Sequence, residues 1–216
     1  MVQTRTIGVM LVDDHAIVRT GFRRLLEDSP DIRVVGEAAD GEEALKVYAE
    51  VRPDVVVLDV SMPEGMGGLE ATARLLAVDS AARILILSAY EEEPYPSRLI
   101  QAGARGYLSK RCAPAELGDA VRAVVRGEKY LSSEVARKSA ISRMMGKEGI
   151  FDTLSGREFE VFRLLAECKS VEQIADILCL SPKTVGTHRT SIMKKLEISS
   201  TAELERLAIR HGIVEA

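Results

Sequence analysis

Short apolar runs that end on polar residues recur through the first half of the chain. Residues 7–12, 55–58, 84–87 and 106–108 are such runs, and segments with helical periodicity separate them. This alternation builds βαβ units, and unbroken Val, Leu and Ile suit strands buried on both faces of a parallel sheet. The pattern predicts strands at 8–12, 33–37, 55–58, 83–87 and 106–108, and helices at 16–26, 41–50, 69–78, 97–102 and 115–126. The expected fold is therefore a doubly wound α/β domain with five parallel strands.

The polar residues that end these runs carry the chemistry of the chain. Asp13 and Asp14 follow the first run, Asp59 the second, Ser88 the third and Lys110 the fourth. In an open parallel sheet the carboxyl ends of the strands meet at one edge, where ligands bind. Crowded carboxylates repel each other and favour a hard divalent cation, so we predict a Mg²⁺ site there. A carboxylate held against Mg²⁺ can accept a phosphoryl group.

Each of these residues also has an ordinary structural explanation. An acidic pair after a strand can be a solvated turn, a single Asp can cap a helix, and a lysine can simply lie on the surface. Their joint occurrence at the ends of four strands favours a functional site over these alternatives.

The charge of the chain is uneven. A net charge of −4 argues against a uniformly basic nucleic-acid binder, but residues 181–196 contain four cations and no acid. One basic stripe on an acidic protein suits a binder that touches nucleic acid with a single element.

No apolar run approaches the length that spans a bilayer, and the N-terminus does not resemble a signal peptide. Three widely spaced cysteines form no metal-binding pattern, so we expect buried, reduced thiols in a cytoplasmic protein without membrane contact.

The strand pattern stops before the C-terminal third of the chain. Residues 127–150 lose the alternation; 132–145 can form a helix, and the glycines at 146 and 149 suggest a flexible joint. Beyond it, four helix starts are indicated, at the capping boxes Ser155–Glu158, Ser170–Gln173 and Ser200–Glu203 and at Ser181-Pro182. We predict domains at 1–126 and 151–216, the second a small all-α bundle of four helices, with a linker at 127–150.

The motifs of the first domain resemble the receiver domain of two-component response regulators, which has a flavodoxin-like fold. They are Asp13-Asp14, Asp59-Val-Ser-Met-Pro63, Ser88-Ala89 and Tyr107-Leu-Ser-Lys110. The resemblance implies that Asp59 is phosphorylated and that Mg²⁺ is held by Asp14, Asp59 and the Ser61 carbonyl, with Asp13 acting through water. It also implies that Ser88 and Lys110 contact the phosphoryl group, and that Tyr107 is a switch aromatic that turns inward.

One loop departs from the family pattern. Receivers usually have Met-Pro-Gly-x-x-Gly, whereas this chain has Met62-Pro-Glu-Gly-Met-Gly-Gly68, with Glu64 apparently added. Because the loop borders the site, we expect an effect on the lifetime of the phosphate.

The second domain resembles the LuxR-type helix-turn-helix, with the motif at about residues 170–189. At 100° per residue Val185, Ile192 and Leu196 form one stripe of the second helix, and the opposite face is free to enter the major groove. On that face, Lys183, Thr187 and Thr190 can reach base edges, and Gly186 permits close approach. The expected phosphate contacts are Thr184, Arg189, Lys194 and Lys195.

Together the two domains resemble the NarL/FixJ class, and within it the global regulators of the GacA/UvrY type. Residues 91–103 and 179–185 and the ending after Ala208 carry the closer resemblance. It implies a GacS/BarA-type sensor histidine kinase as phosphodonor and promoters of small regulatory RNAs as targets. Phosphorylation would free the second domain and favour a homodimer that binds double-stranded DNA at an inverted repeat.

Two other functions could use some of the same residues. Haloacid-dehalogenase-like phosphatases also form an aspartyl phosphate, but they require Asp-x-Asp, and Asp59-Val60-Ser61 lacks the second acid. A regulator that works without phosphorylation would not need the complete acidic set. We therefore expect no enzyme activity beyond self-catalysed phosphorylation and dephosphorylation.

Overall fold

The computed structural model describes residues 6–62, 66–144, 150–151, 153–178 and 180–214. Its N-terminal part is built on one parallel sheet with the strand order β2-β1-β3-β4-β5-β6. The order reverses between β1 and β3, which is where the crevice opens in sheets of this type. The strands are β1 (Ile7–Val12), β2 (Ile32–Ala38), β3 (Val55–Asp59), β4 (Ile84–Ser88), β5 (Gly106–Ser109) and β6 (Tyr130–Leu131).

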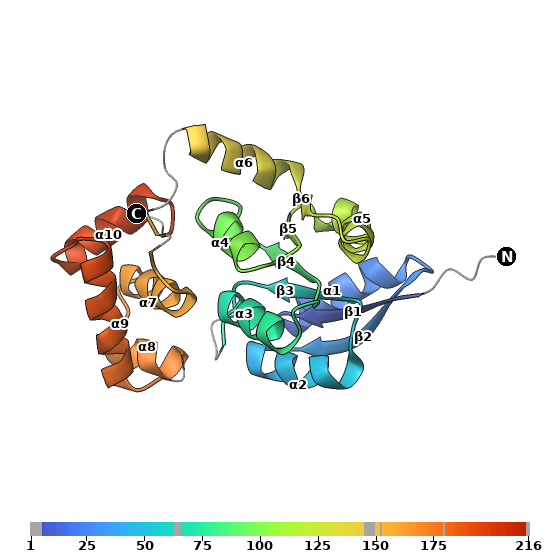
Figure 1. The fold of residues 1–216 in the computed structure, drawn as a ribbon, viewed down its shortest axis with the longest axis horizontal. Helices are drawn as coiled ribbons and strands as arrows, with labels where there is room; N and C mark the ends of the chain where they lie inside the picture. The colour runs from blue at the N-terminus through green and yellow to red at the C-terminus, as the bar shows by residue number, and fades with distance from the viewer. Residues whose placement is uncertain (1–5, 63–65, 145–149, 152, 179, 215–216) are drawn as a thin grey trace.

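Helices cover both faces of this sheet (Figure 1). On one face lie α1 (Ala16–Glu27) and α5 (Ala113–Val125), which contact each other; on the other lie α2 (Gly41–Val51), α3 (Gly68–Val78) and α4 (Tyr95–Gln101). Successive strand residues point to opposite faces. Val57 of β3 therefore belongs to the apolar cluster under α1 and α5, and its neighbours Val56 and Leu58 belong to the cluster on the other face.

The five predicted strands are confirmed, but the prediction missed a sixth. Strand β6 comes from the segment that was predicted to be a linker, and it pairs with β5 through Gly106 and Tyr130. Only two residues long, β6 has no apolar run that could have revealed it. Close pairing depends on Gly106, because a Cβ there would lie 3.0 Å from the Tyr130 carbonyl oxygen.

The helix predicted within 132–145 is α6 (Ser133–Met144), and it also packs on the N-terminal domain. Val135 is fully buried, and the Lys138 ammonium lies 2.8 Å from a Glu91 carboxylate oxygen. The first part of the predicted linker is thus built onto the sheet domain. The predicted joint at 146–149 lies outside the described residues.

The C-terminal domain consists of α7 (Gly156–Ala166), α8 (Val171–Ile177), α9 (Pro182–Lys195) and α10 (Thr201–Arg210). The capping boxes predicted for α7 and α8 are complete, and Ser181 caps α9 directly before Pro182. The third box is only half formed. Ser200 accepts the Glu203 N–H, but the Glu203 carboxylate accepts the N–H of Ser199 instead of that of Ser200.

One apolar cluster runs through both domains. It joins the sheet residues under α2, α3 and α4 to Phe151 and Phe159 of the C-terminal domain. Helix α7 contacts α3, while α9 lies farther from the sheet (Figure 1). In the described part of the chain the domains therefore meet on the face of the sheet that carries α2, α3 and α4, and α7 makes the main helix contact there, with α3.

The cysteines and the helix lengths bear on the expected thiol burial and membrane contact. The prediction of buried thiols is wrong for Cys168, which is exposed in the turn after α7; Cys112 is half-buried, and Cys179 lies outside the described residues. Among the described residues, no helix combines the length and apolar character needed to cross a bilayer.

Candidate phosphoacceptor site and nucleic-acid interface

Asp59 is the buried centre of the acidic site. It ends β3 with only 2% of its surface exposed. One carboxylate oxygen accepts the Ser61 N–H at 3.1 Å, and the other accepts from the Lys110 ammonium at 2.8 Å. Helix α3 begins directly against this strand end, because a Cβ on Gly68 would lie 2.4 Å from the Asp59 carbonyl oxygen. Glycine at 68 therefore allows the close approach that frames the site.

Lys110 joins two of the predicted carboxylates. Its ammonium lies 2.7 Å from Asp13 and 2.8 Å from Asp59, and Asp13 is 4% exposed. Burial lowers the pKa of Lys110, but the two carboxylates outweigh burial and raise it above the ordinary value. Burial raises the pKa of Asp59, with a contribution from the Asp13 charge, although Lys110 and the Ser61 N–H act against the shift. One ammonium therefore does not fully offset the desolvation of Asp59.

Asp14 and His15 extend this acidic site toward the surface. The ligand atoms of Asp13, Asp14 and His15 all lie within 4.8 Å of one another, and His15 Nδ1 is 2.8 Å from an Asp14 oxygen. Oxygen donors suit Mg²⁺, and a second cation would offset the remaining cost of the buried carboxylates, so the donor set fits the predicted metal. Asp59 does not belong to this tight group. Its part in metal binding, like that of the Ser61 carbonyl, stays a prediction.

The predicted switch residues meet around Tyr90. Ser88 is fully buried at the end of β4, and its Oγ accepts the Tyr90 N–H at 3.0 Å. The Tyr107 ring is also fully buried, and its hydroxyl donates to the Tyr90 carbonyl at 2.5 Å. The Tyr107 side chain therefore points into the sheet domain in the docked chain, and its role as a switch stays a prediction. Tyr90 was not predicted to take part, because nothing in its sequence neighbourhood marks it.

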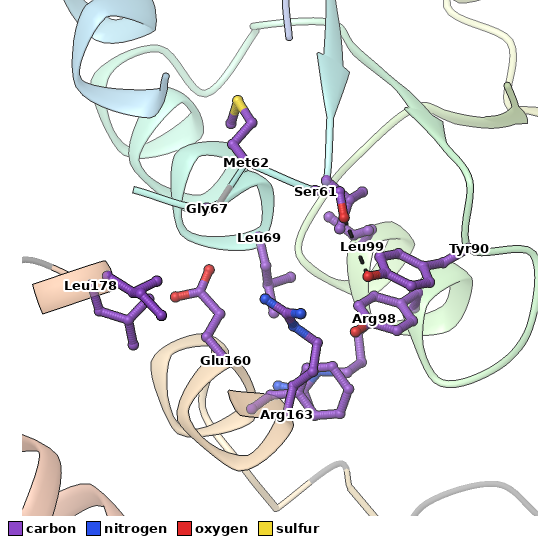
Figure 2. Close-up of a pocket in the computed structure, with 14 residues that line it drawn as sticks. Ser61, Met62, Gly67, Leu69, Tyr90, Arg98, Leu99, Glu160, Arg163 and Leu178 are labelled. Carbon is purple, nitrogen blue, oxygen red and sulfur yellow. Dashed lines mark hydrogen bonds between the residues drawn. The ribbon is translucent and has the colours of Figure 1, made fainter. Parts of the chain in front are cut away.

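A cavity of about 40 Å³ lies between this site and the C-terminal domain (Figure 2). Ser61 and Tyr90 approach it from the sheet domain, and Glu160 and Arg163 approach it from α7 (Figure 2). A cavity this small holds a few water molecules at most, so it is not a site for a metabolite.

Helix α9 presents the predicted DNA-binding residues. Its buried face carries Val185 and Ile192, as the periodicity predicted. The opposite face is exposed at the following positions: Lys183, Thr187, Arg189, Thr190 and Lys194. Thr184 and Gly186 are half-buried, and a Cβ on Gly186 would meet nothing within 4 Å. The docked sheet domain therefore leaves the proposed DNA-reading face of α9 open.

The hydroxyls on this face are already oriented. Thr187 Oγ1 donates to the Lys183 carbonyl and Thr190 Oγ1 to the Gly186 carbonyl, each at 3.0 Å. Each oxygen keeps lone pairs directed outward, which can accept from the amino groups of adenine or cytosine in the major groove.

Lys195 is held by a residue that was not predicted to be functional. Its ammonium lies 2.6 Å from Glu158, and Ser191 Oγ donates to the same carboxylate at 2.6 Å. Glu158 also closes the capping box of α7, so a single buried acid connects α7 to the recognition helix. The capping motif at Ser155 indicated the local role of Glu158, but its contact with α9 spans 37 residues. The phosphate contact predicted for Lys195 must therefore form beside this pair.

Comparison with known proteins agrees with both halves of this description. Residues 9–122 match the family model of the response regulator receiver domain, and residues 152–208 match that of the bacterial regulatory proteins of the luxR family. The chain is 45% identical over 212 residues to the response regulator GacA of Pseudomonas aeruginosa, covering 97% of this chain and 99% of that protein. It is 44% identical over 212 residues to the response regulator UvrY of Escherichia coli, covering 97% of each protein.

A solved structure that matches both domains of the chain is that of RcsB from Salmonella enterica serovar Typhimurium, bound to the promoter rprA in the presence of the phosphomimetic BeF3-. It is 27% identical, covers 94% of this chain and 98% of that chain, and superposes with a TM-score of 0.70. Both matched domains, in the same order and over nearly the whole length of GacA and UvrY, show that the chain belongs to the two-component response regulators with a LuxR-family DNA-binding domain.

Proposed function

We propose that this chain is a DNA-binding transcriptional regulator controlled by phosphorylation of Asp59. The supporting observation is the buried Asp59 carboxylate, which shares one ammonium with Asp13, on a chain whose C-terminal domain presents an open helix-turn-helix face. We keep the division into a receiver at 1–126, a linker at 127–150 and a DNA-binding domain at 151–216 as part of the proposal, with β6 and α6 of the linker segment packed on the receiver.

The phosphoryl group would come from a phosphohistidine of a sensor histidine kinase. An Asp59 oxygen attacks phosphorus, the new P–O bond forms, the P–N bond breaks, and the electron pair stays on the imidazole. Lys110 would follow the incoming anion, and Ser88 Oγ would donate to it. Mg²⁺ would be held by Asp14, Asp59 and the Ser61 carbonyl, with Asp13 acting through water, and would supply charge neutralisation for the transferring group. The receiver then catalyses only its own phosphorylation and dephosphorylation.

DNA binding would depend on pairing two copies of α9. A helix-turn-helix dimer reads two half-sites about one helical turn apart, which requires an inverted repeat. Because the face of α9 is open in the docked chain, the receiver would control how two DNA-binding domains come together instead of covering the helix. RcsB supports this proposal, because its structure is that of a promoter complex formed with a phosphomimetic.

The similarity to GacA and UvrY extends the proposal to partners and targets. We propose a kinase of the GacS/BarA type as phosphodonor, promoters of small regulatory RNA genes as targets, and the cytoplasm as the site of action.

The acceptor is tested with the full chain, Mg²⁺ and a small-molecule phosphodonor, followed by intact-mass measurement. We expect one phosphoryl group on the wild type and none on Asp59→Asn. The matched control is Asp119→Asn, which changes an exposed carboxylate (79% exposed) at the surface of α5. Labelling that persists in Asp59→Asn would exclude Asp59 as the acceptor, and labelling that is unaffected by chelation of the metal would exclude Mg²⁺ from the site.

The regulatory function is tested by sequencing genomic fragments that bind the chain with and without phosphodonor. We expect fragments that share an inverted repeat and that are enriched several-fold by the phosphodonor. Enrichment that is equal in the two samples would refute control by phosphorylation, even if the fragments themselves are specific.

A further inference from the structure

Tyr90 is attached to the phosphoacceptor site at three points. Its N–H donates to Ser88 Oγ, its carbonyl accepts from Tyr107, and its hydroxyl lies 3.3 Å from Ser61 Oγ (Figure 2). Ser61 is two residues beyond Asp59, and its N–H donates to that carboxylate. A displacement of the Asp59 loop, of Ser88 or of Tyr107 therefore acts on Tyr90.

The Tyr90 ring connects the phosphoacceptor site to α4. It stacks on Tyr95 with ring centroids 4.4 Å apart and planes 8° from parallel. Tyr95 is 8% exposed, and its ring meets Phe159 of α7 edge to face at 5.3 Å. Aromatic pairs at these distances are attractive and depend on geometry, so a rotation of Tyr90 changes the surface that Tyr95 offers to Phe159. Three aromatic rings thus bridge the receiver and the DNA-binding domain.

Arg98 secures the same contact one turn farther along α4. Its guanidinium donates to the carbonyls of Phe151 at 2.5 Å and Leu154 at 2.7 Å, and it lies 4.7 Å from the centre of the Phe159 ring. Arg98 itself is 9% exposed. A charged donor that binds two carbonyls in a buried position needs a fixed geometry, because the desolvated charge is otherwise uncompensated. The docking of α7 therefore depends on where α4 holds Arg98.

We propose that Tyr90 and Tyr95 form an aromatic relay from the phosphoacceptor site to the DNA-binding domain, and that Arg98 is the latch that the relay opens. Movement at the acceptor rotates Tyr90 out of its stack on Tyr95, α4 shifts, and Arg98 loses the Phe151 and Leu154 carbonyls. The DNA-binding domain then separates from the receiver at α7, which leaves it free to pair on DNA with the same domain of a second chain. The inference specifies the regulation of the proposed function and rests on it, but the latch can be measured without a phosphodonor.

Loss of the Arg98 latch and loss of the Tyr90–Tyr95 relay should change different docking constants. The docking equilibrium of the full chain can be measured by small-angle scattering of the monomer, with and without phosphodonor, at matched occupancy of Asp59 determined by mass. Arg98→Ala removes the latch that phosphorylation would open, so we expect a docking constant lowered by about 5- to 150-fold without phosphodonor and little further change with it. Arg126→Ala is the control, because its guanidinium pairs only with Glu128 within the receiver among the described contacts, and we expect no change.

Tyr90→Leu should instead leave the docking constant without phosphodonor close to that of the wild type, because the Arg98 contacts remain. With the stack lost, phosphorylation no longer reaches α4, and the ratio of the docking constants without and with phosphodonor should fall to nearly one while Asp59 is still labelled. Tyr130→Leu is the matched control, because this tyrosine packs on the opposite apolar cluster and should leave the ratio as in the wild type. A Tyr90→Leu chain that docks less but keeps the wild-type ratio would make Tyr90 a structural residue only and refute the relay.

The remaining outcomes are also decisive. Docking without phosphodonor that is unchanged in Arg98→Ala would refute the latch. A wild-type chain that is not labelled at Asp59 would refute the proposed function, while the effect of Arg98→Ala without phosphodonor would still report on the latch.

Discussion

The phosphoacceptor site and the DNA-reading face are assembled in opposite ways. Lys110 bridges Asp13 and Asp59 across 97 and 51 residues of sequence, and both acids are almost fully buried. The DNA-reading face instead comes from one helix, α9, whose outward side chains are exposed and spaced by helical periodicity alone. Burial couples the first set of residues to one another, whereas exposed residues on one helix act nearly independently. Substitutions in the first region should therefore have large, coupled effects, and those in the second should have small, additive effects.

The largest effect is expected from removing the cation that the buried acids share. Lys110→Ala leaves Asp13 and Asp59 without their common partner, and a buried carboxylate that loses its partner costs about 3 kcal/mol. Urea unfolding without metal should show this loss, and added Mg²⁺ should recover more stability in the variant than in the wild type. Lys110→Arg keeps the charge and serves as the control. Equal stability of Lys110→Ala and wild type without metal would mean that the acids are not coupled through Lys110.

Glu158 is a buried acid of the DNA-binding domain, and it tests whether burial there has the same consequence. Burial raises the pKa of Glu158, but hydrogen bonds from Lys195, Ser191 and Ser155 outweigh burial and lower the pKa to about 2. The ionised carboxylate therefore stabilises the fold above its ordinary pKa of 4.5, and the stabilisation is lost as the pH falls from 4.5 toward 2.

Glu158→Gln should consequently cost roughly 2–3 kcal/mol at neutral pH, and the difference from the wild type should shrink as the pH falls through that window. Denaturant unfolding of the full chain at several pH values measures it. Glu197→Gln, at an exposed position of the same domain, is the control and should show no such dependence. A difference that does not depend on pH would contradict the role of the ionised carboxylate.

On the open face of α9, the threonines should affect which sequence is bound. Thr187→Ala removes an outward acceptor while preserving the helix, so we expect a loss of about 1 kcal/mol, or roughly fivefold, for the preferred sequence and a smaller loss for others. Fluorescence anisotropy on an enriched fragment and on single-base variants measures this. A uniform loss over all sequences would assign Thr187 to the phosphates and not to a base.

The smallest effect should come from an exposed lysine. Lys194→Ala should weaken binding a few-fold for every sequence and reduce the slope of log affinity against log salt by about 0.9. Lys169→Ala, an exposed lysine outside α9, should leave both quantities unchanged. A salt slope that Lys194→Ala leaves unchanged would remove this residue from the DNA contact.

Prediction from the sequence succeeded where the signal is local. Periodicity identified the strands of both buried faces, capping motifs located the starts of α7, α8 and α9, and the open face of α9 followed from helical spacing. It failed where a short element depends on a distant partner. Strand β6 pairs closely with β5 at Gly106, and its two residues are too short a run to show the period of a strand.

The residues of the acidic site were predictable because their sequence signal is local. The contacts that connect this site to the DNA-binding domain were not predictable. The apolar runs are followed by acids, Ser88 and Lys110. Because parallel strands all point the same way, these groups lie together at one edge of the sheet. Tyr90, Tyr95 and Arg98 carry no comparable pattern. Tyr95 and Arg98 reach the DNA-binding domain because α7 packs against their side chains, and the Arg98 hydrogen bonds span 53 and 56 residues of sequence. The local sequence therefore determined which chemical groups form the site, whereas the long-range packing of buried side chains determined how the site connects to the DNA-binding domain.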